Sequence, residues 1–124
     1  MNEQDKQLLL RDICARLPYN VKGVVAGEDD CVITALDIAE DRAIMPYLRP
    51  MSSMTQDECR QLFMLLPTYY CVFQDRINTT SLGSKILPEH IEIITDFYNS
   101  HHLDWRGLIP KALALEAPIG TYNI

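Results

Sequence analysis

The hydrophobic pattern changes twice along this chain, and those changes limit the folds open to it. Helical spacing over residues 3–17 predicts an amphipathic helix that Pro18 ends, with Asp12 and Arg16 on the side away from the core. Short β-branched runs follow at 21–26 and 31–38, separated by a turn. The apolar positions of that helix are Leu9, Leu10, Ile13, Cys14 and Leu17. We therefore expect a helix and then an antiparallel hairpin, with a third strand at 43–45.

Two further helices are indicated by their start signals. Thr55 stands three residues before Glu58, which is the spacing of a capping box, and predicts a helix over 56–66. Met54 and Cys59 are placed as its hydrophobic staple. Pro88 predicts the start of another helix that runs to about residue 100. The residues expected to face the core are Cys59, Leu62, Phe63 and Leu66 in one helix and Ile91, Ile94, Phe97 and Tyr98 in the other.

The remaining segments complete the predicted architecture. Residues 69–73 are typical of a strand, and 78–84 have the composition of a loop. The two prolines of 46–50 cannot both donate to a ladder, so we expect an extended edge or a connector there. The fold class is α+β, a single domain over 1–124. It has a small antiparallel sheet of two to four strands, with the N-terminal helix and two further helices packed on it.

The charge of the chain is uneven and its sum is −6. That sign makes nucleic acid an unlikely partner. Six acids and no base fall within 28–41, whereas the rest of the chain carries as many bases as acids. We hypothesise that Glu28, Asp29 and Asp30 face a basic protein partner. The alternative is that they keep the hairpin soluble and protect its edge.

The sequence also indicates a compartment. No apolar run reaches membrane-spanning length, and the N-terminal residues do not resemble a secretory signal, so we expect a cytoplasmic protein without a membrane partner. The four cysteines lack metal-site spacing and are expected to be reduced thiols. They are Cys14, Cys31, Cys59 and Cys71. No motif for a cofactor or a metal is present, and we expect neither.

The richest polar cluster contains His101, His102, Asp104 and Arg106. These side chains could supply a general base, its orienting partner and an anion clamp. Adjacent helical residues point about 100° apart, however, so the two histidines cannot share a site if the helix continues through them. Helix termination and turn formation explain the same residues, and we commit to no catalytic residue.

Tyr47 and Arg49, which lie between two prolines, are candidates for partner binding. With Leu48 they could form a stiff, exposed strip that fits a groove of a partner. The alternative, which we favour, is that Tyr47 and Leu48 pack on the helix at 56–66 while Arg49 offsets a nearby acid.

Several stretches together resemble a group of small uncharacterised proteins of gut anaerobic bacteria, their prophages and their mobile elements. The stretches are 16–19, 46–55, 104–109 and 114–118, which cover about a fifth of the chain. Trp105 stands where the pattern has Tyr, and Ala112 where it has Gly. The resemblance implies an intracellular bacterial or phage-borne protein and brings no activity with it.

Three functions follow as hypotheses. The leading one is a non-catalytic interaction or accessory protein of a phage or mobile element. The alternatives are a small enzyme that uses His101, Asp104 and Arg106, and a nucleic-acid-associated protein. A closed core with an acidic flank would favour the interaction protein, whereas a deep pocket at His101 or His102 would favour the enzyme.

Overall fold

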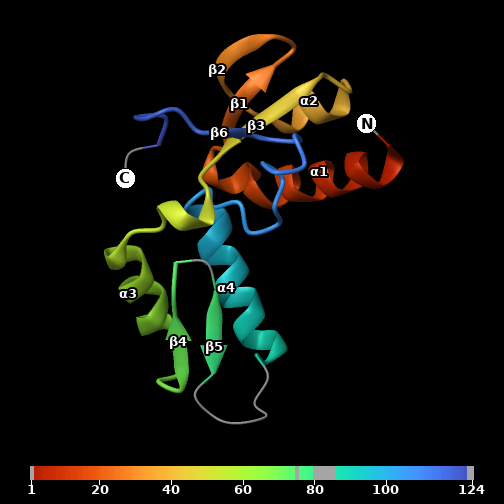
Figure 1. Cartoon of the computed structure of the whole chain (residues 1–124). Coiled ribbons are helices and arrows are strands. Elements are labelled where there is room, and N and C mark those ends of the chain that lie inside the picture. Colours follow the sequence, from red (N-terminus) through yellow and green to blue (C-terminus); the bar gives the residue numbers. More distant parts are fainter. Residues whose placement is uncertain (1, 75, 80–85, 123–124) are drawn as a thin grey trace.

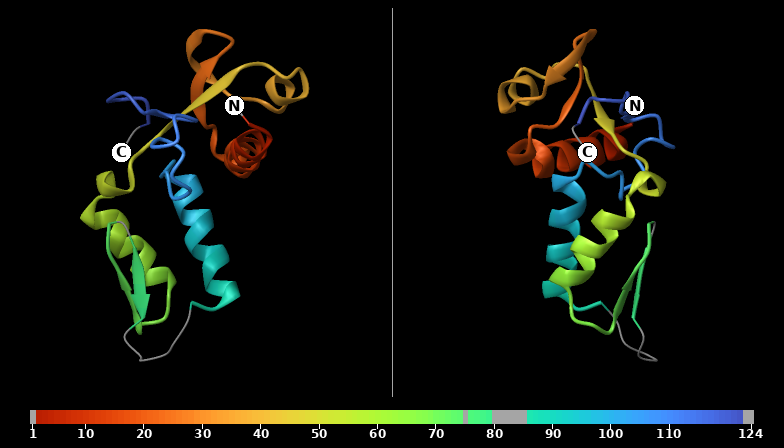
Figure 2. Two further views of the ribbon diagram at one scale, coloured as in Figure 1. Left: turned by 45° about the vertical axis from the view of Figure 1, so that its right-hand side comes forward. Right: turned by 90° about the vertical axis from the view of Figure 1, so that its left-hand side faces the viewer.

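The computed structural model describes residues 2–74, 76–79 and 86–122. They form two lobes, each with its own hydrophobic cluster, and the α+β class is confirmed. The sheet lobe comprises residues 2–49 and 104–122, and the helical lobe comprises the described residues of 50–103. Figures 1 and 2 show the sheet lobe at one end of the molecule and the helical lobe at the other. No helix within the described ranges is long and apolar enough to cross a membrane.

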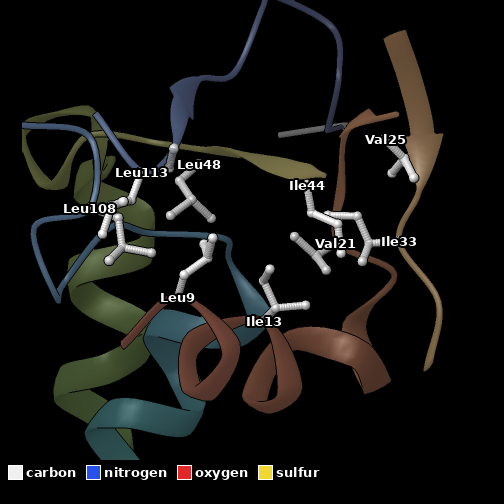
Figure 3. Packing of buried hydrophobic residues seen from close by; sticks show 10 residues of the cluster. Leu9, Ile13, Val21, Val25, Ile33, Ile44, Leu48, Leu108 and Leu113 are labelled. Carbon is white, nitrogen blue, oxygen red and sulfur yellow. The ribbon is translucent and has the colours of Figure 1, made fainter. Parts of the chain in front are cut away.

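The sheet lobe begins with the predicted N-terminal helix. Its elements are α1 (Glu3–Arg16), the short 3-10 helix η1 (Leu17–Tyr19), β1 (Lys22–Val25), β2 (Glu28–Val32), α2 (Ala35–Ala39), β3 (Ile44–Leu48) and β6 (Leu115–Glu116). The Asn2 side chain caps α1 by accepting a hydrogen bond from the Asp5 amide at 2.7 Å. Leu9 and Ile13 point from α1 into the cluster under the strands (Figure 3).

The four-stranded sheet has the order β2-β1-β3-β6. β1 runs antiparallel to both neighbours, but β6 is parallel to β3, so the sheet is mixed rather than antiparallel. The prediction of an edge or connector at 46–50 was wrong, because β3 lies inside the sheet. Gly23 makes this possible: a Cβ there would lie 2.3 Å from the Met45 carbonyl oxygen and 2.7 Å from the Pro46 Cα.

The predicted second strand at 31–38 was also wrong in its second half. β2 ends at Val32, and α2 starts after Thr34, whose hydroxyl accepts from the Asp37 amide at 3.3 Å. The Asp37 carboxylate accepts from the Thr34 amide at 2.9 Å, which completes a capping box. These local bonds outweigh the β-forming composition of the segment.

The helical lobe contains η2 (Met51–Ser53), α3 (Gln56–Leu65), β4 (Tyr70–Val72), β5 (Ile77–Thr79) and α4 (Pro88–Ser100). The predicted capping box is confirmed: the Glu58 amide donates to the Thr55 hydroxyl at 3.1 Å, and the Thr55 amide donates to Glu58 at 2.9 Å. The strand over 69–73 is confirmed as β4. β5 forms where 78–84 was predicted to be a loop, although 80–84 lie outside the described residues.

The helices α3 and α4 build the second hydrophobic cluster with Tyr70 of β4, so they do not cover the four-stranded sheet as predicted. Most of the expected inward positions are buried. Cys59 is half-buried, and Phe63 and Ile91 are exposed.

Candidate functional site

A polar cleft of about 840 Å³ lies between the two lobes. The end of η1, the start of β1, Arg49 after β3, the start of α3, the end of α4 and the C-terminal segment all contribute to it. Its lining residues are Tyr19, Asn20, Lys22, Arg49, Thr55, Asp57, Glu58, Gln61, Ser100, His101, His102, Thr121 and Tyr122. Both histidines that the sequence singled out therefore belong to one cavity.

The two lobes are joined at the base of this cleft. The amide of Arg49 donates to the His102 carbonyl at 2.7 Å, and the Asp104 amide donates to the Arg49 carbonyl at 2.8 Å. The chain passes between the lobes at these two places, and the two connecting segments are hydrogen-bonded to each other.

His101 caps α4 and is held by a carboxylate. Its Nδ1 lies 2.8 Å from Oε2 of Glu58, and its ring stacks on Phe97. Because Glu58 accepts from the Nδ1–H, Nε2 is the ring nitrogen left for a partner in the cleft. The side chain is 30% exposed, so the imidazole is accessible from the cleft.

Glu58 is anchored by Arg49 through two hydrogen bonds of 2.8 Å each. Arg49 also donates to the carbonyls of Ser53 and His101 at 3.0 and 3.2 Å. Burial acts to raise the pKa of Glu58, but hydrogen bonds from Arg49 and the Thr55 amide, together with the nearby positive charges, outweigh it and lower the pKa to about 2. Glu58 is therefore an anion that fixes the cleft wall.

His102 lies beside His101 but in a different environment. Its φ of 60° is left-handed, so the helix has ended and both histidines can line one cleft, contrary to the argument from a continuing helix. The ring stacks on Tyr122 with centroids 3.6 Å apart. Burial lowers the pKa of His102 to about 4, and the charges of Arg16, His101 and Arg49 act in the same direction. The ring is neutral at neutral pH.

Tyr122 lines the cleft beside His102 and forms hydrogen bonds to residues far away in the sequence. Its hydroxyl accepts from the Lys22 amide and donates to the Tyr47 carbonyl, both at 2.8 Å. Burial raises the pKa of Tyr122 to about 12. Sequence analysis missed this residue because nothing local signals a contact across 100 positions.

Asp104 and Arg106 do not join the histidines. The Asp104 carboxylate accepts from the amides of Leu108 and Ile109 at 2.7 and 2.9 Å, so it stabilises a turn. Arg106 pairs with Asp12 at 3.2 Å and lies over the Trp105 ring. The set His101, Asp104 and Arg106 is thus not assembled into one site.

Asp12 and Arg16 are buried, although the sequence placed them on the solvent side of α1, and Cys14, which was placed on the core side, is exposed. Arg16 bonds Asp12 at 2.9 and 3.2 Å and donates to the Leu103 carbonyl at 2.6 Å. The four-residue spacing of this Asp and Arg was the available signal.

The exposed strip considered for Tyr47 and Arg49 does not form, as the favoured alternative expected. Tyr47 is 7% exposed and Arg49 is 5% exposed. Leu48 packs in the sheet-lobe cluster rather than on α3, whereas Arg49 does offset an acid, Glu58. The favoured alternative was therefore correct for Arg49.

The acidic segment is partly neutralised by bases just outside it. Arg42 pairs with Asp37 and Glu40, and Lys6 pairs with Asp41. The residues of 28–30 are exposed on β2, the outer strand, next to an irregularity in its pairing with β1. Carboxylates and a bulge on an outer strand are typical of edge protection, and partner binding by Glu28, Asp29 and Asp30 stays a prediction.

The part of the chain that the structure describes contains no cluster of three or more His, Cys, Asp or Glu side chains that could hold a metal ion. The four cysteines are free thiols.

Comparison with protein-family models, with curated proteins and with solved structures gives no match to this chain. Function is therefore argued from the cleft itself.

Proposed function

We propose that this chain is a non-catalytic interaction protein and that the cleft between its lobes holds the partner molecule. The observation that carries the proposal is the cleft of about 840 Å³, a size typical of ligand sites, with polar walls drawn from both lobes. The Arg49–Glu58–His101 network keeps one wall in place without a ligand. A preformed wall lowers the cost of ordering on binding.

A pocket at the two histidines was the feature expected to favour the enzyme, but the partners of its polar side chains support binding rather than catalysis. Glu58 is saturated by Arg49, Thr55 and His101, and Asp104 is occupied by backbone amides. His102 is neutral and covered by Tyr122. A phage or mobile-element origin is supported by the sequence resemblance alone.

Native mass spectrometry of the protein purified from its own cells tests this proposal. Gln61 is exposed and lines the cleft, whereas Glu92 is exposed on α4 outside it. We expect a bound species on the wild type and on Glu92→Trp, and its loss from Gln61→Trp, whose indole fills the cleft. Retention by Gln61→Trp, or no bound species on the wild type, contradicts the proposal.

Acid–base catalysis by His101 is a second candidate, favoured by the 2.8 Å contact that orients its ring with Glu58. This candidate predicts that His101→Gln retains binding but accumulates an unreacted species of different mass. The interaction proposal predicts the same bound mass on both proteins.

A further inference from the structure

The basic groups behind the cleft outnumber the carboxylates that pair with them. Two buried carboxylates each serve two basic partners. Asp12 is shared by Arg16 and Arg106, and Glu58 is shared by Arg49 and His101. The third buried carboxylate of this region, Asp104, binds backbone amides rather than a basic side chain, so the basic groups share two ion-pair acceptors.

Arg16 shows the excess most clearly. Its side chain is 0% exposed, and its Nη1 finds no hydrogen-bond partner among the described residues. The Nδ1 of His102 is likewise buried and unpartnered within those residues. Buried donors are normally paired, and an unbalanced buried charge is costly. His102 lines the cleft and directly precedes Leu103, whose carbonyl holds the Arg16 guanidinium.

Lys22 adds a further cation from the sheet lobe. It lines the cleft, and no ion pair to its ammonium occurs within the described part of the chain. Two acids also line the cleft: Glu58 is paired with Arg49, and Asp57 is 79% exposed and pairs with Arg60 at 3.3 Å. Solvent screens that charge more than it screens buried ones.

We propose that the cleft binds an oxyanion, a carboxylate or phosphate group of its ligand, between Lys22 and His101. The Lys22 ammonium and the Nε2–H of the His101 imidazolium, whose Nδ1–H is held by Glu58, supply the direct contacts. The buried guanidinium of Arg16 supplies a favourable potential behind them. This inference rests on the proposed function, because it names the charge of the group that the cleft holds.

Amide shift mapping with inorganic phosphate and with acetate, at constant ionic strength, tests the inference. We expect saturable shifts grouped at residues 22, 100–102 and 121–122. Lys22→Gln should weaken the affinity about tenfold or more, because it removes a charged donor. Lys111→Gln, an exposed lysine outside the cleft, should leave the affinity unchanged. Saturation by phosphate alone assigns a phosphate group, and saturation by acetate alone assigns a carboxylate.

Absence of saturable shifts with both anions overturns the inference, as does an equal loss in Lys22→Gln and Lys111→Gln. If Lys22→Gln does not fold, His101→Gln is used with the same expectation. If native mass spectrometry finds a bound species but neither anion shifts the amide signals, the cleft remains a binding site and the oxyanion inference is rejected. The two proposals can therefore fail separately.

Discussion

Replacing Glu58 with Gln is expected to destabilise the protein by about 3–5 kcal/mol, the usual cost of removing one member of a buried ion pair. The change keeps the shape of the side chain but removes its charge. The guanidinium of Arg49 would then stay buried without a counterion, and His101 would lose its acceptor. The amide of Gln can replace only part of these hydrogen bonds.

The pKa of Glu58 gives the same magnitude independently. Its shift from the usual 4.5 to about 2 corresponds to about 3 kcal/mol of preference for the charged form in the folded protein. Because the folded-state pKa is the lower one, this contribution is complete above about pH 4.5. It is lost as the pH falls through that value toward 2. Glu58→Gln should therefore flatten the decline of stability in this acidic range.

Urea unfolding at neutral pH measures the effect. An equal dependence of the unfolding free energy on urea concentration in both proteins checks that the unfolded state is unchanged. Asp57→Asn is the matched control, since Asp57 precedes Glu58 in α3 but forms an exposed pair with Arg60. That control should change stability little, as exposed pairs do. If Glu58→Gln costs no more than Asp57→Asn, the buried network does not hold the cleft wall.

Three further outcomes follow from the structure and the sequence. Thr55→Ala should lose about 0.5–2 kcal/mol of stability, because it leaves a helix donor unpaired, and an unchanged unfolding midpoint would reject the cap. Neutralising residues 28–30 with Gln and Asn should weaken capture of a basic partner and its salt dependence, whereas neutralising Glu89, Glu92 and Asp96 should not. Equal capture by both triple variants would contradict partner binding by residues 28–30 and favour a role of these acids in solubility. All four thiols should react with a thiol reagent in the unfolded, unreduced protein, and an incomplete reaction would reveal a disulfide.

The helices α1, α3 and α4 were predictable because their signals are local. The pair Thr55 and Glu58 identifies the start of α3 from four residues, and Pro88 does the same for α4. The box of Thr34 and Asp37 was missed because its closing acid is Asp rather than Glu. The interior position of Pro46 depends on Gly23 in another strand, and no pattern within 46–50 reveals it.

The cleft was predictable only in part. His101 and His102 were found because they stand together in the sequence, but the carboxylate that orients His101 comes from another helix. The acid expected to serve them, Asp104, binds its own following turn instead. The contact of Arg106 with Asp12 spans 94 positions. Periodicity describes neighbours along the chain, so contacts of this kind lie outside its reach.

Site-specific photo-cross-linking in the cells that make the protein tests the central claim most directly. A photoreactive residue at position 61 would point into the cleft, and the same residue at position 92 would lie on the exposed face of α4. A binding cleft predicts a discrete adduct from position 61 and none of that mass from position 92. The same adducts from both positions, or none from position 61, would contradict the claim that this cleft holds the partner.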